Sequence, residues 1–316
     1  MNGATPECRH VIIIGAGAMG CLFAARILEA GASVTLVDTN LQRLEAIERL
    51  GLELHDDSGP RTLRPLTARA EEASAPVDLL ILFTKGLHSA AAVRSIAHLA
   101  RFAPVALTLQ NGLGNAEILA EAFGAERVLK GTAHVPADLQ PPNRVLSHGF
   151  TQIDLGGHVP AAHTLTAGVA QLLRDSGFGV DVREDIEAAI WNKLAFNAAL
   201  NATAMISGSC NAAMNNPAGQ RIAAAVVHET VAVAAAAGLR LDSHDIYETV
   251  LKALAGHPAH KASMLQDREA GRLTEIQFIN GAIVRAGERY GIATPVNATL
   301  TDLVQLIEAT NGKSNG

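Results

Sequence analysis

The chain is poor in aromatic residues and has no excess of basic charge. Of its 316 residues only one is Trp, two are Tyr and eight are Phe. Few aromatic side chains are therefore available for nucleic-acid bases to stack on. Lys and Arg number 25 against 31 Asp and Glu, for a net charge of −6, which is unlike the basic surface of a nucleic-acid-binding protein. We expect no nucleic-acid partner.

Cysteine is also scarce, and long apolar runs are missing. Cys8, Cys21 and Cys210 are far apart and odd in number, which predicts no disulfide framework and fits a reducing compartment. The N-terminal stretch lacks a basic segment followed by an apolar core, the pattern of a secretory signal. The longest uncharged run, residues 194–220, is interrupted by several Asn residues, unlike a membrane helix. We expect a soluble cytoplasmic protein with no membrane partner.

Histidine does not form a metal-binding pattern either. His228-Glu229 lacks the second His of an HExxH motif, and His257-Pro-Ala-His260 offers only two nitrogen ligands. A zinc site needs three or four protein ligands. We therefore expect no bound metal.

The apolar residues follow a different pattern in each half of the chain. In the first half, short apolar runs at 10–14, 33–37, 78–83 and 105–109 alternate with helical segments, which is typical of βαβ units and a doubly wound parallel sheet. From about residue 185, Ala-rich helical patterns follow one another at 186–204, 218–237, 244–255, 274–290 and 298–308. The chain is long enough for two domains. We predict an α/β domain over residues 1–183 and an all-helical domain over residues 184–316.

A glycine-rich turn lies between the first predicted strand and the helix that follows it. Its residues form a GxGxxG motif: Gly15, Ala16, Gly17, Ala18, Met19 and Gly20. The first Gly permits a tight turn, the second lets the backbone approach a pyrophosphate, and the third lets helix and strand pack closely. In this context the motif predicts a dinucleotide-binding site; the alternative is a strand–helix turn without a ligand.

Asp38 ends the second predicted strand. An acidic side chain at this place hydrogen-bonds the adenosine 2′-OH of NAD and repels the 2′-phosphate of NADP. The next two residues are not basic, and the first Arg is Arg43. We therefore favour NADH over NADPH, the alternative being that Asp38 only stabilises a turn.

A polar stripe crosses an otherwise apolar helical segment. Lys193, Asn197 and Asn201 are spaced i, i+4 and i+8, so they share one helix face. A solvated face usually carries Glu, Lys and Arg, and Asn is a poor helix former, so the stripe indicates the wall of a cleft. Desolvation of a Lys makes it a competent proton donor near neutral pH, and amides can orient a hydroxyl or carbonyl. A short exposed stripe is the alternative.

These motifs are similar, in order from residue 10 to about 295, to those of the ketopantoate reductase (2-dehydropantoate 2-reductase) family. The resemblance rests on the glycine loop, the 191–201 stripe and three further segments: Thr84-Lys85, Leu109-Gln-Asn111-Gly-Leu-Gly114 and 263–276. It implies a Rossmann domain followed by a helical domain, with the active site in the cleft between them. It also implies reduction of ketopantoate to (R)-pantoate, a step toward coenzyme A.

The resemblance implies a role for individual residues. Lys193 matches the general acid that protonates the oxygen at C2 while hydride arrives from the nicotinamide, and Glu275 matches a carboxylate near the cofactor ribose; we count both as catalytic. The other cofactor positions are Lys85, Asn111 and Ala137, in addition to the glycine loop and Asp38. The substrate positions are Asn111, Lys193, Asn197, Asn201, Asn211, His260 and Ser263.

Each carried-over residue has a purely structural alternative. Lys85 would be a solvated strand-end lysine, Asn111 a turn former, and Ser263 a helix cap. Glu275 would only favour the dipole at a helix N-terminus.

Two departures from the family pattern bear on specificity. Thr39 stands where NADPH-using members carry Arg, although the family usually uses NADPH, and His260 stands where an amide is more usual. The alternative function is therefore an NADH-dependent D-2-hydroxyacid dehydrogenase acting on another branched or aromatic 2-oxo acid. A non-catalytic dinucleotide sensor is a third possibility, which the intact polar stripe disfavours. A homodimer through the helical domain is the expected assembly.

Overall fold

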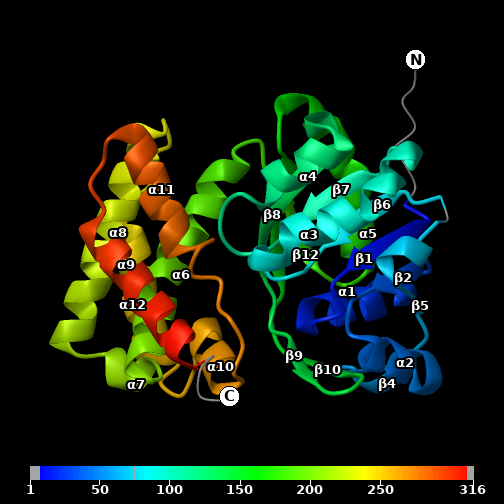
Figure 1. Ribbon diagram of the computed structural model, residues 1–316, viewed down its shortest axis with the longest axis horizontal. Coiled ribbons are helices and arrows are strands. Elements are labelled where there is room, and N and C mark those ends of the chain that lie inside the picture. The colour runs from blue at the N-terminus through cyan, green and yellow to red at the C-terminus, as the bar shows by residue number, and fades with distance from the viewer. Residues whose placement is uncertain (1–7, 75, 312–316) are drawn as a thin grey trace. The chain divides into compact units, whose positions relative to one another are not determined.

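The computed structural model describes residues 8–74 and 76–311 and divides into two compact units (Figure 1). The first unit runs to Gln110 and again from Gly114 to Ile186. The second contains Asn111–Leu113 and the described residues from Glu187 onward. The division falls close to the boundary placed at 183/184 by the sequence, but the excursion of Asn111–Leu113 into the second unit is not foreseen there.

An eight-stranded sheet forms the centre of the first unit, in the order β12-β11-β8-β7-β6-β1-β2-β5. Its strands are β1 (His10–Ile14), β2 (Ser33–Val37), β5 (Leu66–Ala68), β6 (Leu79–Leu82), β7 (Val105–Thr108), β8 (Val128–His134), β11 (Gln152–Gly157) and β12 (Gly179–Val182). Strands β5, β2, β1, β6, β7 and β8 are parallel, whereas β11 pairs with β8 antiparallel. The sheet is therefore mixed: the expected parallel arrangement holds for six strands, whereas β11 and β12 run in the opposite direction. The chain between β8 and β11 forms strands and no helical crossover, which a parallel return would need.

Helices cover both faces of this sheet, and alternate residues of β1 enter different cores. Val11 and Ile13 pack with residues of α1 (Ala18–Glu29) and α5 (Thr166–Asp175). Ile12 and Ile14 pack with residues of α3 (Gly86–Ile96) and α4 (Asn115–Phe123). Burial on both sides explains why this strand is a continuous apolar run.

A second, four-stranded sheet in the order β4-β3-β10-β9 belongs to the same unit. Its strands are β3 (Leu52–Asp56), β4 (Gly59–Leu63), β9 (Asp138–Gln140) and β10 (Arg144–Ser147). Helix α2 (Leu41–Leu50) precedes it, and short 3-10 helices lie at Ala70–Glu72, Ala97–Phe102, Ala125–Arg127 and Pro160–Leu165. None of these four strands is expected from the sequence.

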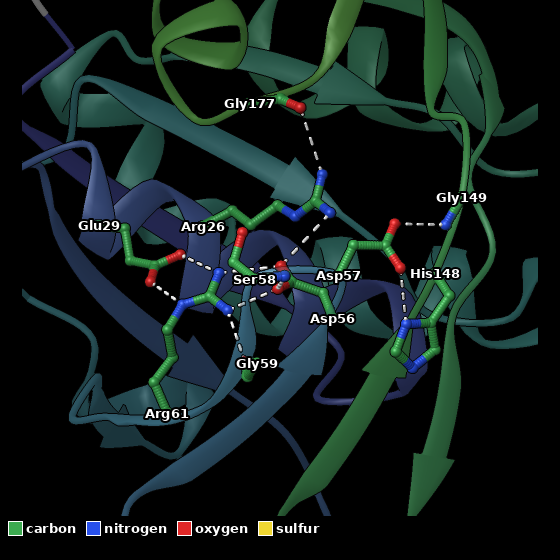
Figure 2. A network of polar contacts seen from close by, with 10 residues as sticks. All are labelled: Arg26, Glu29, Asp56, Asp57, Ser58, Gly59, Arg61, His148, Gly149 and Gly177. Atoms are coloured by element: carbon green, nitrogen blue, oxygen red, sulfur yellow. Dashed lines mark hydrogen bonds and ion pairs between the residues drawn. The ribbon is translucent and has the colours of Figure 1, made fainter.

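A polar network joins the β3–β4 hairpin to α1 (Figure 2). Arg61 donates to Asp56 through two nitrogens at 2.6 and 2.9 Å, and to Glu29 Oε2 at 2.9 Å. Arg26 of α1 lies 3.7 Å from Asp56 and donates to the Gly177 carbonyl at 3.3 Å. The hydrogen bonds from Arg61 lower the pKa of Asp56. The network is a partly buried ionic attachment between elements distant in sequence.

The described part of the second unit contains helices and no strand. Its helices are α6 (Ile186–Ser207), α7 (Asn211–Met214), α8 (Pro217–Ala236), α9 (Ser243–Gly256), α10 (Ser263–Glu269), α11 (Asn280–Tyr290) and α12 (Pro295–Asn311). The helix expected from residue 274 begins only at Asn280. Thr274 starts a turn instead, because its Oγ1 accepts from Ile276 N at 3.2 Å and its N–H donates to Glu308 at 2.7 Å. Within residues 8–74 and 76–311, no helix is both long and apolar enough to cross a membrane.

Candidate active site

The predicted cofactor residues of the first unit follow the carboxyl ends of parallel strands. The Gly15–Gly20 loop follows β1, Asp38 follows β2, Lys85 follows β6 and Ala137 follows β8. Strands β2, β1, β6, β7 and β8 are neighbours in the sheet, so these segments lie along one edge. Ligands of open α/β sheets bind at this edge, near the point where the strand order reverses.

The glycine loop provides space for a dinucleotide pyrophosphate. A Cβ at Gly15, which has φ +104°, would lie 2.9 Å from the Phe83 carbonyl, and one at Gly20 would lie 1.8 Å from the Gly15 oxygen. These two glycines therefore permit close packing. Gly17 differs, because nothing lies within 4 Å of its Cβ position. It is the N-cap of α1, whose first turn has no acidic residue, so the open space and the helix N-terminus fit an anion here.

Asp38 and Arg43 both reach the backbone of this loop. Asp38 accepts from Ala16 N at 2.6 Å and from Asn40 N at 2.7 Å. Arg43 donates to the Ala16 carbonyl at 3.2 Å, and its buried Nε has no hydrogen-bond partner in the described chain. The carboxylate is thus held beside the glycine loop, and its role as a ribose ligand stays a prediction. Arg43 is a neighbour that the sequence pattern does not reveal, since it lies within the first turn of α2.

Gln110 is a second residue that sequence reasoning misses. Its side-chain amide donates to Ser89 Oγ at 2.9 Å and to the Thr84 carbonyl. It therefore ties the carboxyl end of β7 to the segment after β6. Lys85 directly follows Thr84 and Asn111 directly follows Gln110, so the amide helps to position the two segments that carry them. The Gln-Asn-Gly sequence was recognised only as part of a family motif.

In the second unit, the polar stripe of α6 is largely withdrawn from solvent. Lys193 and Asn197 are half-buried, and Asn201 is 5% exposed. Asn197 Nδ2 approaches Asn111 Oδ1 at 3.5 Å. This face of α6 is therefore not a solvated surface. The i, i+4, i+8 spacing brings the Lys193 ammonium and the amides of Asn197 and Asn201 to the same side of the helix.

The segment Asn111–Leu113 is held on the second unit by backbone contacts. Leu113 N donates to the Phe278 carbonyl at 3.0 Å. Gly112 has φ +90°, and a Cβ there would lie 2.1 Å from the same carbonyl oxygen. Only glycine fits, so the close approach determines where Asn111 lies beside Asn197.

The remaining predicted substrate residues lie in or next to α7 and α10. Asn211 is 1% exposed; its Nδ2 donates to the Ala253 carbonyl at 3.0 Å, and its N–H donates to the His260 carbonyl at 3.1 Å. Its Oδ1 is buried without a hydrogen-bond partner in the described chain. Ser263 is exposed as the first residue of α10, and Glu275 is half-buried in the 274–279 turn. Their catalytic and binding roles stay predictions.

No three His, Cys, Asp or Glu side chains gather closely enough to hold a metal ion within the described ranges. Burial raises the pKa of Cys21 to about 12, and its Sγ donates to the Ala16 carbonyl at 3.3 Å. This thiol is a packing group of the glycine loop and no nucleophile.

Two family matches cover most of the chain. Residues 11–159 match the family described as ketopantoate reductase PanE/ApbA, and residues 185–308 match its C-terminal domain. The chain belongs to the ketopantoate reductase family. This confirms the resemblance drawn from the motifs, and with it an oxidoreductase that uses a nicotinamide dinucleotide and a small-molecule substrate.

Relatives named 2-dehydropantoate 2-reductase are similar over nearly their whole length. The 2-dehydropantoate 2-reductase of Archaeoglobus fulgidus is 34% identical over 305 residues, covering 95% of this chain and 98% of the relative. That of Halobacterium salinarum is 32% identical over 301 residues, covering 95% and 99%.

Solved structures of two kinds share the fold. A D-mandelate dehydrogenase with NADH and anilino(oxo)acetate has a TM-score of 0.92 at 28% identity, covering 96% of this chain and 99% of the other. The 2-dehydropantoate 2-reductase of Geobacter metallireducens has a TM-score of 0.88 at 29% identity, covering 94% and 99%. A Rossmann-like unit followed by a helical unit is thereby confirmed.

Proposed function

We propose that this chain reduces 2-dehydropantoate to (R)-pantoate with a reduced nicotinamide dinucleotide. The observation that carries the proposal is the α6 face on which Lys193, Asn197 and Asn201 share one side, with Asn111 held beside Asn197. Curated relatives of this activity are 34% and 32% identical over almost the full chain, which supports the choice of substrate.

The site residues have different proposed roles in cofactor binding, proton donation and substrate binding. The glycine loop and Asp38 hold the dinucleotide, which when bound supplies the hydride that C2 of the oxo acid receives. Lys193 donates a proton to the C2 oxygen, so the carbonyl becomes a hydroxyl. Asn197 and Asn201 orient the substrate without adding charge, and Asn111, Asn211, His260 and Ser263 complete its binding, with Lys85, Ala137 and Glu275 at the cofactor.

We further propose that NADH is preferred over NADPH. The Asp38 carboxylate is anchored by two backbone N–H groups, so a 2′-phosphate there would face a fixed negative charge. Replacing Asp38 by Asn removes the charge and keeps one of the two oxygens that accept from the backbone N–H groups. We expect Asp38→Asn to shift the ratio of kcat/KM values for NADPH and NADH toward NADPH by about tenfold, roughly 1.4 kcal/mol.

Asp175→Asn is the control for this substitution, because Asp175 is an exposed carboxylate at the end of α5. It should leave the cofactor ratio unchanged. A preference of the wild-type enzyme for NADPH would contradict the proposal that Asp38 selects NADH.

A second candidate is supported by the solved structure with NADH. The D-mandelate dehydrogenase shares the fold at a TM-score of 0.92, and Asp38 fits the same cofactor. The alternative activity is therefore NADH-dependent reduction of another branched or aromatic 2-oxo acid to its D-2-hydroxy acid.

Steady-state kinetics with two substrates separates these candidates. We would measure kcat/KM for 2-dehydropantoate and for phenylglyoxylate, each with NADH and with NADPH. Turnover of 2-dehydropantoate above about 10⁴ M⁻¹s⁻¹, with weaker use of phenylglyoxylate, supports the first candidate. The reverse order supports the second. Tight cofactor binding without turnover of any 2-oxo acid would favour a dinucleotide sensor instead.

We also propose a cytoplasmic homodimer formed through the helical unit. Leu303 and Leu306 share one face of α12 and are 40% and 62% exposed, and Leu273 is 54% exposed, so apolar area is left for a second copy. The scarcity and odd number of cysteines fit a reducing location. Light scattering would give the mass of the assembly, and a monomer at micromolar concentration would contradict the dimer.

A further inference from the structure

The middle of α6 receives a hydrogen bond from a buried amide on another helix. Asn280, the first residue of α11, donates through Nδ2 to the Ala198 carbonyl at 3.1 Å and to Asn297 Oδ1 at 3.0 Å. Asn280 and Asn297 are 0% exposed. Ala198 directly follows Asn197 and lies three positions before Asn201. The contact therefore acts on the turn that carries both substrate amides.

The orientation of the Asn280 amide is determined by its neighbours. Both groups near Nδ2 are oxygen acceptors, so the reversed amide would bring oxygen against oxygen. In the observed orientation Oδ1 is buried without a partner in the described chain. A leucine would avoid this unsatisfied oxygen, but it could not donate to α6.

The other end of this hydrogen-bond chain is a buried carboxylate. Glu229 of α8 is 9% exposed; its Oε2 accepts from Asn297 Nδ2 at 2.7 Å and from Asn297 N at 3.0 Å, and its Oε1 accepts from Val296 N at 2.8 Å. Both N–H groups belong to the first turn of α12, where a negative charge is favourable. Glu229 thus orients Asn297 so that its Oδ1 faces Asn280.

We propose that Asn280 is a positioning residue of the substrate site, a role that rests on the proposed function. Through the Ala198 carbonyl it fixes the rotation of the α6 turn that presents Asn197 and Asn201 to the 2-oxo acid. Glu229 and Asn297 hold Asn280 in the required orientation. Of the proposed cofactor residues only Asn111 and Glu275 belong to the same unit as Asn280, so we expect a substitution of Asn280 to change the Kd of NADH much less than the KM for the 2-oxo acid.

Kinetics of an Asn280→Leu variant tests the role, with Asn280→Ala as a smaller, uncharged second variant. The matched control is Thr230→Val, because Thr230 is 0% exposed on α8 and its Oγ1 donates only within its own helix, to the Val226 carbonyl at 2.7 Å. For each protein we would confirm folding by circular dichroism. We would then measure KM and kcat for the 2-oxo acid, and the Kd of NADH by fluorescence.

We expect both Asn280 variants to raise the KM for the 2-oxo acid about tenfold or more, since small displacements of substrate-positioning groups are costly. The Kd of NADH should change much less, and Thr230→Val should change neither quantity. An unchanged KM in the folded Asn280 variants would overturn the role, as would an equal rise in Thr230→Val. If Asn280→Leu does not fold, Asn280→Ala decides. Wild-type turnover tests the proposed function by itself, whereas only the ratio of variant to wild-type KM tests the positioning role.

Discussion

At the scale of single residues, Lys193 is the group on which the proposed chemistry depends. It is half-buried on α6 and lies one helical turn before Asn197. A ketone that accepts hydride develops negative charge on oxygen, and a nearby ammonium both stabilises that charge and supplies the proton. Neither Asn197 nor Asn201 can donate a proton outright, so the three side chains are not interchangeable.

Replacing Lys193 by Ala removes the proton donor. We expect kcat to fall about 10²–10⁴-fold, while the Kd of NADH stays unchanged. The control is Lys252→Ala, since Lys252 is an exposed lysine on α9 of the same unit. A Lys193→Ala enzyme with wild-type kcat would assign the proton donation to another group.

At the scale of secondary-structure elements, the glycines of the β1–α1 connection have different roles. Gly20 is needed for packing, whereas Gly17 is proposed to be needed for cofactor binding. Gly20 allows α1 to pack on the loop, because a Cβ there would lie 1.8 Å from a backbone oxygen. Gly17 has open space around it, so packing does not require glycine there, whereas the proposed pyrophosphate does. One motif therefore contains glycines required for different reasons.

Alanine substitutions in the loop should separate these reasons. We expect Gly20→Ala to lower the thermal unfolding midpoint of the protein, since backbone atoms must shift. Gly17→Ala should leave the midpoint unchanged and weaken NADH binding about tenfold or more, because the added methyl group occupies the pyrophosphate space. Gly256→Ala is the control, as nothing lies within 4 Å of that Cβ position at the end of α9. Unchanged NADH affinity in Gly17→Ala would contradict binding of the pyrophosphate at this loop.

At the scale of the whole molecule, contacts between distant segments complete the first unit. The small sheet pairs β3 with β10, and the network around Arg61 joins the hairpin to α1 (Figure 2). The side chain of Asp56 is 8% exposed, and hydrogen bonding to Arg61 lowers its pKa. A folded-state pKa below the unfolded value of about 3.9 stabilises the fold above that pH.

The Asp56 contribution should disappear in acid. We expect Asp56→Asn to lower the thermal unfolding midpoint at neutral pH, because two guanidinium groups lose a buried partner. The difference from wild type should shrink as pH falls below about 4, since the wild-type carboxylate is then protonated as well. Glu48→Gln is the control, as Glu48 is an exposed carboxylate on α2 of the same unit. A difference that does not depend on pH would show that the charge of Asp56 is not what stabilises the hairpin.

The sequence determined those features that depend on neighbouring residues. Strands β1 and β2 have the predicted bounds, because a continuous apolar run buried on both faces is readable locally. The glycine loop and the α6 stripe are equally local, since turn geometry and helical spacing follow from a few consecutive residues. Family motifs then supplied candidate roles for residues such as Lys85 and Ser263, which no local pattern distinguishes from turn formers and caps.

Only the tertiary structure decided features that depend on partners far away in the chain. The direction of β11 follows from its pairing with β8, and the small sheet forms because residues near 53 meet residues near 145. The place of Asn111 depends on the Phe278 carbonyl, and the hold on α6 depends on Asn280. Such contacts arise between side chains and backbone groups that share no sequence period, so their physical cause becomes visible only when the chain is folded.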